Sequence, residues 1–171
     1  MNIVLIGMPG SSKSTSGRRA AAMLGFRFAD TDAVVERRAK MTIPEIFAKG
    51  GEALFRELET EAAITVSGYT DAVIATGGGI VVKRDNMAVL NKNAVTVYLS
   101  ATPEALFKRI KDSRNRPLLR GAMSVETLAA MLEVRGSLYK KYSRRTVDTT
   151  GLTAEQTAAK IVDTYIAENS K

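Results

Sequence analysis

The chain has 171 residues, 45% of them hydrophobic and 25% charged, which suits one folded domain with a buried core. It contains no cysteine and no histidine, which excludes disulfides, thiolate metal sites and an imidazole base or metal ligand. The formal net charge of +7 fits either a nucleic-acid-binding protein or a protein that binds small anions.

These exclusions narrow the chemistry that the chain can perform. Acid or base catalysis would fall to Asp, Glu, Lys or Tyr, and a metal held by oxygen ligands would be magnesium rather than zinc. Only 6% of the residues are aromatic, and no basic run is interleaved with aromatic residues, so a small polyanion is favoured over nucleic acid. The apolar start is too short to span a bilayer and resembles no signal peptide, so we expect a cytoplasmic protein without a membrane partner.

Short apolar runs alternate with helical patterns along the whole chain. Strands are expected at Ile3–Ile6, Phe26–Phe28, Ala72–Ala75, Ala94–Leu99 and Thr146–Val147. Helices are expected to begin near Lys13, Thr42, Gly51, Lys83, Thr102, Ser124 and Thr153. This alternation predicts an α/β fold whose parallel sheet is covered on both faces and binds ligands at the carboxyl ends of its strands. We see no linker or repeat and expect a single domain over residues 1–171.

Three of the expected helices carry start signals. Thr42 with Glu45, and Thr153 with Gln156, have the spacing of capping boxes. Pro103 follows Thr102 and would occupy the first position of its helix, where a proline has no amide to leave unpaired.

The first strand leads into a segment that nearly matches the phosphate-binding motif G-x-x-x-x-G-K-[ST]. Residues Gly7–Thr15 read GMPGSSKST and lie between a strand and a helix, as this motif requires. Backbone amides and the helix N-terminus would bind phosphates, Lys13 would reach the β- and γ-phosphates, and Ser14 would ligate magnesium. The alternative is an ordinary strand–helix turn. Ser12 stands where the motif has its last glycine.

The second strand is followed by two aspartates, Asp30 and Asp32, separated by one residue. Asp32 could simply cap a helix over Ala33–Lys40. The two carboxylates could instead serve a magnesium ion and an acceptor hydroxyl.

Two further segments admit a ligand-binding and a purely structural interpretation. Gly77–Gly79 end the third strand, and three successive glycines favour the close approach of a ligand over a plain turn. Arg56 could bind an anion or pair with Glu52 four residues earlier.

The second half of the chain offers two more candidate arginines. Residues 111–123 (KDSRNRPLLRGAM) form a basic segment typical of a functional lid or of disorder, in which Arg116 could stabilise charge on a transferring phosphoryl group. Arg135, in the following helix, could bind a carboxylate or remain a solvated surface charge.

In their order and spacing these motifs resemble the shikimate kinase family, from Met1 to about Thr149. The resemblance rests on the phosphate loop, Asp30-Thr-Asp32, Gly-Gly-Glu with Phe55-Arg56 and Glu59, Thr-Gly-Gly-Gly79, Arg116-Pro-Leu-Leu, and Arg135 with Leu-Tyr139. It implies a P-loop kinase architecture in three layers, with a five-stranded parallel sheet flanked by helices. It also implies a substrate-binding helical region at about 32–62 and a mobile lid at about 111–123.

The resemblance implies an activity and a role for each matched residue. The γ-phosphoryl group of ATP would pass to the 3-hydroxyl of shikimate, with magnesium, in aromatic amino-acid biosynthesis. ATP would be bound by Gly10, Ser11, Ser12, Lys13, Ser14, Thr15, Arg109 near the adenine, and Arg116. Magnesium would be held by Ser14 and Asp30. Shikimate would be bound by Asp32, Arg56, Gly77, Gly78, Gly79 and Arg135, with the two arginines on its carboxylate. The catalytic residues would be Lys13, Asp32 as the candidate base, and Arg116.

The sequence departs from the family pattern at Ser12 and within Thr149–Thr153, which lacks an arginine that some members place near the adenine. Two alternatives therefore stay open: a gluconate-kinase-like enzyme, and a binding module whose catalysis is impaired at Ser12. We expect a monomer.

Overall fold

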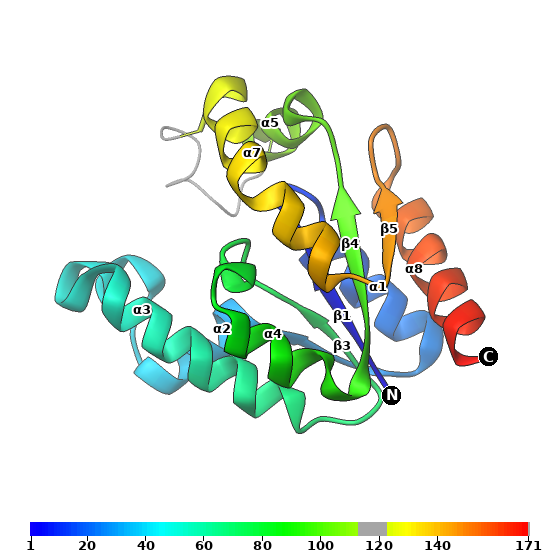
Figure 1. Ribbon diagram of the computed structural model, residues 1–171, viewed down its shortest axis with the longest axis horizontal. Helices are drawn as coiled ribbons and strands as arrows, with labels where there is room; N and C mark the ends of the chain where they lie inside the picture. The colour runs from blue at the N-terminus through cyan, green and yellow to red at the C-terminus, as the bar shows by residue number, and fades with distance from the viewer. Residues whose placement is uncertain (113–122, 171) are drawn as a thin grey trace.

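The computed structural model describes residues 1–112 and 123–170, and its centre is one parallel sheet (Figure 1). Its strands are β1 (Asn2–Ile6), β2 (Arg27–Asp30), β3 (Ala72–Ala75), β4 (Ala94–Ser100) and β5 (Arg145–Asp148). They lie in the order β2-β3-β1-β4-β5, and every neighbouring pair is parallel. All five expected strands are confirmed, with ends that differ by no more than two residues.

Helices follow the strands in turn. They are α1 (Lys13–Leu24), α2 (Thr31–Ala39), α3 (Ile43–Ser67), α4 (Arg84–Leu90), α5 (Pro103–Asp112), α7 (Val125–Tyr142) and α8 (Ala154–Asn169), with short 3₁₀ turns η1 (Ile80–Val82) and η2 (Asn91–Asn93). Both expected capping boxes are present, at Thr42 and at Thr153. The helices expected to begin near Thr42 and Gly51 are both present: α3 consists of two helical segments that meet at a kink at Gly51, where φ is 65°.

The start of α2 corrects one of the two interpretations of the aspartates. Asp30, not Asp32, caps this helix: its side chain accepts a hydrogen bond of 3.0 Å from the amide of Asp32. The cap lies earlier than expected because Thr31 already has helical geometry directly after β2. Asp32 therefore lies in the first turn of the helix, where a negative charge is favourable.

Alternating residues of the strands face two separate hydrophobic cores. Ile3 and Leu5 of β1 pack with residues of α1 and α8 on one face, whereas Val4 and Ile6 pack with α3, α4 and α7 on the other. Figure 1 shows this three-layer arrangement, which confirms the predicted fold class. No helix within the described residues is long and apolar enough to cross a membrane.

The strand order brings the predicted motifs to one edge of the sheet. β2, β3 and β1 are neighbours, so their carboxyl ends place Asp30, the glycine segment and the phosphate loop beside one another. Thr76 reinforces this edge, because its hydroxyl donates a hydrogen bond of 2.8 Å to the carbonyl of Leu5.

Candidate active site

The phosphate loop is held in a conformation that two glycines permit. Gly7 and Gly10 have φ values of 149° and 81°. A Cβ would lie 2.5 Å from the carbonyl oxygen of Leu99 at Gly7, and 2.8 Å from that of Leu106 at Gly10. Side chains at these two positions would therefore prevent the backbone from curving into a phosphate-binding loop.

Lys13 lies over this loop. Its side chain is largely buried, and Nζ donates hydrogen bonds to the carbonyl oxygens of Gly7 and Met8, both at 2.8 Å. A third hydrogen bond, of 3.2 Å, goes to Oγ of the buried Ser11. The ammonium group is thus placed at the mouth of the loop, where a bound phosphate would meet it.

Ser12 adopts a left-handed conformation, with φ 62° and ψ 22°. A residue with a Cβ rarely adopts this conformation, which explains why the motif has a glycine here. Its hydroxyl forms a hydrogen bond of 2.8 Å with the hydroxyl of Ser16, one turn along α1.

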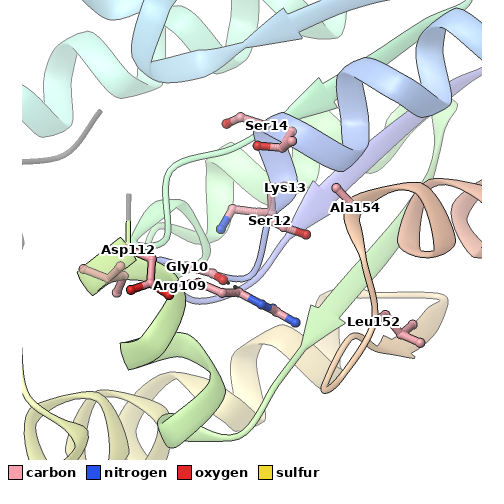
Figure 2. Close-up of a pocket in the computed structure, with 10 residues that line it drawn as sticks. Gly10, Ser12, Lys13, Ser14, Arg109, Asp112, Leu152 and Ala154 are labelled. Atoms are coloured by element: carbon pink, nitrogen blue, oxygen red, sulfur yellow. Dashed lines mark hydrogen bonds between the residues drawn. The ribbon is translucent and has the colours of Figure 1, made fainter. Parts of the chain in front are cut away.

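A cavity of about 410 Å³ opens beside the loop (Figure 2). Its size suits a small-molecule ligand. It is lined by Gly10, Ser12, Lys13, Ser14, Thr15, Arg109, Ile110, Asp112, Leu152 and Ala154. Five of the residues expected to bind ATP in the phosphate loop, together with Arg109, therefore share one cavity.

Arg109 joins the phosphate loop to the segment after β5. Its guanidinium donates to the carbonyl of Gly10 at 3.4 Å, to Thr149 Oγ1 at 2.9 Å, and to the carbonyl of Thr149. Burial lowers the pKa of Arg109, and the charge of Asp148 opposes this shift. Thr149 therefore fixes Arg109 beside the cavity. Thr149 belongs to the stretch Thr149–Thr153, which lacks the arginine that some family members have there.

Ser14 and Asp30 are in direct contact. The Ser14 hydroxyl donates a hydrogen bond to Oδ2 of Asp30, while Oδ1 of Asp30 caps α2. Among residues 1–112 and 123–170, no group of three or more acidic side chains could hold a metal. A hydroxyl and a single carboxylate suit magnesium, which commonly binds through one or two protein oxygens plus phosphates and waters.

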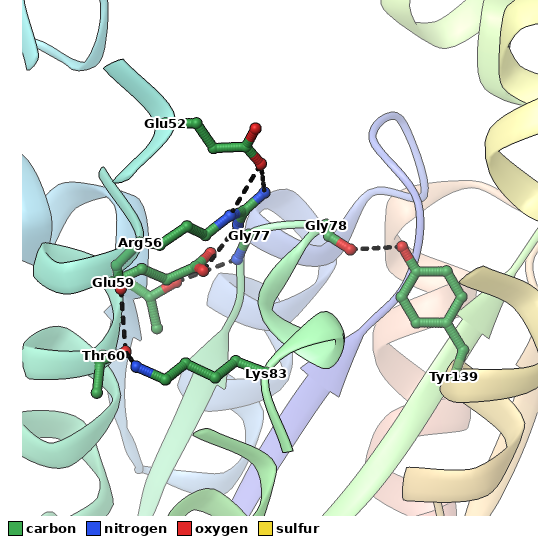
Figure 3. A network of polar contacts seen from close by, with 9 residues as sticks. Glu52, Arg56, Glu59, Thr60, Gly77, Gly78, Lys83 and Tyr139 are labelled. Atoms are coloured by element: carbon green, nitrogen blue, oxygen red, sulfur yellow. Dashed lines mark hydrogen bonds and ion pairs between the residues drawn. The ribbon is translucent and has the colours of Figure 1, made fainter. Parts of the chain in front are cut away.

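On the other side of the phosphate loop, Arg56 is held by two glutamates (Figure 3). Its guanidinium contacts Glu59 at 2.8 Å and Glu52 at 3.3 Å. Burial disfavours its charge, but the hydrogen bonds and charges of the two glutamates raise its pKa. The predicted ion pair between Arg56 and Glu52 is therefore present. Arg56 forms a second ion pair with Glu59, which is more deeply buried because the Glu59 side chain is 1% exposed.

Glu59 also connects this arginine to Arg135. Burial raises the pKa of Glu59, and both its hydrogen bond from Arg56 and the charge of Arg135 oppose the shift. Oε1 of Glu59 has no hydrogen-bond partner within the described part of the chain. The two predicted carboxylate-binding arginines thus act on one buried carboxylate.

The glycine segment lies between these groups and the phosphate loop. A Cβ at Gly77 would lie 2.9 Å from Oδ1 of Asp32, and one at Gly79 would lie 2.6 Å from Nη2 of Arg56. A Cβ at Gly78 would lie 3.1 Å from Cδ of Pro9 in the phosphate loop. Side chains at these positions would displace the neighbouring residues of the site. The three glycines therefore allow Asp32, Arg56 and Pro9 to lie close to the backbone of this segment.

The structure therefore brings together all of the predicted site residues except Arg116, which lies outside the described residues. Sequence reasoning assigned no role to Glu59, Thr31 or Tyr139. Glu59 was detectable as a glutamate one turn after Arg56, and Tyr139 as a residue one turn after Arg135. Thr31 carried no comparable signal.

Comparisons with known proteins agree with this geometry. The family model described as shikimate kinase matches residues 9–166. A shikimate kinase of Thermodesulfovibrio yellowstonii is 42% identical over 164 residues, which cover 96% of this chain and 94% of that protein. The structure of shikimate kinase from Acinetobacter baumannii in complex with shikimate is 35% identical, with a TM-score of 0.91 and coverage of 99% and 95%.

A gluconokinase from Sinorhizobium meliloti shares the fold but little sequence. Its TM-score is 0.61 and its identity 17%, over 99% of this chain and 94% of that one. This likeness shows a common architecture alone, so the gluconate-kinase-like alternative is not favoured. The family model, the curated relatives and the fold agree that this chain belongs to the shikimate kinase family of ATP-dependent small-molecule kinases.

Proposed function

We propose that this protein transfers the γ-phosphoryl group of ATP to the 3-hydroxyl of shikimate, giving ADP and shikimate 3-phosphate. The observation that carries the proposal is the contact between two half-sites. A phosphate loop with an inward lysine meets a glycine segment that is bordered by Asp32 and Arg56. ATP and a small anionic alcohol would therefore bind side by side, as in-line transfer requires.

The nucleotide half of the site would bind ATP through the phosphate loop. The amides of the loop and the N-terminus of α1 favour phosphate oxygens, and Lys13 would exchange its carbonyl partners for the β- and γ-phosphates. Arg109, which lines the nucleotide cavity, would lie near the adenine.

Ser14 and Asp30 would hold magnesium. Their oxygens lie within hydrogen-bond distance of one another, on the loop and at the end of β2. Bound magnesium neutralises charge on the phosphates during transfer.

The acceptor half would recognise an alcohol that carries a carboxylate. Arg56 and Arg135 both lie near the buried Glu59, and Arg56 also pairs with the exposed Glu52. A guanidinium can bind a carboxylate through two parallel hydrogen bonds. Asp32, beside Gly77, would accept the proton of the attacking hydroxyl.

Acceptor specificity and product identity test this proposal. The protein would be incubated with magnesium and ATP, and with either shikimate or gluconate, and the products would be identified by ³¹P and ¹H NMR. We expect a phosphomonoester coupled to the proton at carbon 3 of shikimate, and no product from gluconate. Phosphorylation of gluconate alone would support the rival sugar-acid kinase, whereas binding of shikimate without turnover would indicate the impaired module.

A further inference from the structure

Tyr139 is a buried side chain in α7 whose hydroxyl reaches the glycine segment (Figure 3). It is 0% exposed, and its ring stacks on that of Tyr98, with centroids 5.1 Å apart. The hydroxyl donates a hydrogen bond of 2.6 Å to the carbonyl oxygen of Gly78. A buried hydroxyl needs such a partner, and here the partner belongs to the segment that borders the acceptor.

The hydroxyl stays a donor throughout the pH range in which enzymes work. Burial raises the pKa of Tyr139 to about 12, and the nearby Arg135 opposes the shift. The contact with Gly78 is therefore that of a neutral donor with a neutral acceptor, and it does not depend on pH below about 10.

This hydrogen bond sets the direction of a peptide group that faces the site. Because the peptide unit is planar and trans, the amide of Gly79 points opposite to the Gly78 carbonyl, away from Tyr139. Within the described residues, the amides of Gly78 and Gly79 donate to no protein acceptor. On the other side, Thr31 Oγ1 accepts a hydrogen bond of 3.1 Å from the amide of Gly77.

Tyr139 and Arg135 lie four residues apart in α7, so they share one face of that helix. The same helix face therefore presents a cation to the acceptor site and fixes the backbone beside it. A shift of α7 would move both groups together.

We propose that Tyr139 is a positioning residue for the acceptor: its hydroxyl orients the Gly78–Gly79 peptide so that the amides of this segment face the substrate. This inference rests on the proposed function, because it takes shikimate as the acceptor. The same hydroxyl also lies 3.7 Å from Sδ of Met8 in the phosphate loop, so the KM for ATP has to be measured beside the KM for shikimate.

The test compares Tyr139→Phe with Tyr98→Phe in the full chain. Each variant removes one hydroxyl from the same stacked pair and keeps both rings, but only Tyr139 is bonded to Gly78. The KM values for shikimate and for ATP would be measured for both variants.

We expect Tyr139→Phe to raise the KM for shikimate roughly 2- to 10-fold, the effect of one neutral hydrogen bond, with the KM for ATP unchanged. Tyr98→Phe should change neither. An unchanged KM for shikimate in Tyr139→Phe, an equal rise for ATP, or the same rise in Tyr98→Phe would overturn the role.

A second readout does not depend on the identity of the acceptor. The chain has 13 glycines, so ¹⁵N-glycine labelling gives a simple amide spectrum. The amide signals of Gly78 and Gly79 should move in Tyr139→Phe and stay in place in Tyr98→Phe. If they stay in place in both variants, the hydroxyl does not orient the peptide. If wild-type protein does not use shikimate but these signals move, the proposed substrate fails while the orienting contact stands.

Discussion

Ser12 combines a left-handed backbone with a side chain that this conformation disfavours. Its hydroxyl finds a partner in Ser16, so the loop keeps its shape although the usual glycine is missing. For an ordinary residue, the left-handed conformation costs roughly 1–2 kcal/mol. The sequence revealed the substitution but not the sign of φ, which is set by how the loop joins β1 to α1.

Ser12→Gly should raise kcat/KM for ATP by a factor of up to roughly ten, because it removes this backbone strain from the phosphate loop. The KM for shikimate should not change. Steady-state kinetics of wild type and variant measure the effect, with Ser16→Ala as the control that removes only the hydroxyl partner. A neutral or lower kcat/KM in Ser12→Gly would mean that the loop accommodates serine without cost.

Asp32→Asn should mainly lower kcat, by roughly 10²- to 10⁴-fold, because asparagine cannot take the proton of the attacking hydroxyl. The affinity for ATP should stay near that of wild type. Asp85→Asn, at an exposed position in the first turn of α4, provides a control for the loss of a carboxylate. If kcat were retained in Asp32→Asn, Asp32 would not be the base.

Tyr139 should also affect stability at high pH. A folded-state pKa of about 12 lies above the ordinary value of 10, so the folded protein retains a proton that the unfolded chain releases. This contribution is fully present below pH 10 and is lost as the pH rises from 10 to 12. At pH 11 the loss is on the order of 1 kcal/mol. Urea unfolding at pH 8.5 and 11 should show a smaller pH dependence in Tyr139→Phe than in wild type. Identical pH dependences would show that this hydroxyl is not desolvated.

At the scale of elements, local signals predicted where most helices begin. The capping boxes at Thr42 and Thr153 were readable because both partners lie within four residues of sequence. The cap of α2 was misassigned because Asp30 and Asp32 are both good capping residues, and only the end of β2 decides between them. The kink at Gly51, where φ is 65°, separates the two helices that the sequence predicted, and a glycine adopts this conformation readily.

Helix α7 carries the acceptor-side groups that sequence could only partly assign. Arg135 was predicted from its motif, but its proximity to Glu59 depends on the way α7 packs against the sheet. The contact of Tyr139 with Gly78 joins residues 61 positions apart in the chain. Contacts of this range follow from the fold and not from local pattern.

Arg135→Ala should weaken shikimate binding about 10- to 150-fold, because a hydrogen bond to a charged group contributes roughly 1.5–3 kcal/mol. Titration calorimetry with shikimate measures this loss directly. Lys140→Ala removes a positive charge from an exposed position of the same helix and should leave the affinity unchanged. Normal shikimate affinity in Arg135→Ala would refute its role in binding the carboxylate.

At the scale of the whole molecule, sequence predicted the layers and the edge at which the site forms. It did not predict the strand order β2-β3-β1-β4-β5, which makes the carboxyl ends of β2, β3 and β1 adjacent. That order places Asp30, Gly77 and the phosphate loop together, although they come from separate thirds of the first 80 residues. The net charge of +7 suits a site for two anionic substrates. The monomeric state, and the role of Arg116, stay predictions.

The release of ADP with and without shikimate tests the central claim most directly. Wild-type protein would be incubated with ATP at fixed magnesium, and ADP would be followed in a coupled assay as shikimate is added up to millimolar concentration. The two adjoining half-sites predict little ADP without an acceptor, a saturable increase with shikimate, and loss of that increase when magnesium is chelated. ADP formation that shikimate does not stimulate, alongside clear stimulation by another polyol acid, would contradict the account.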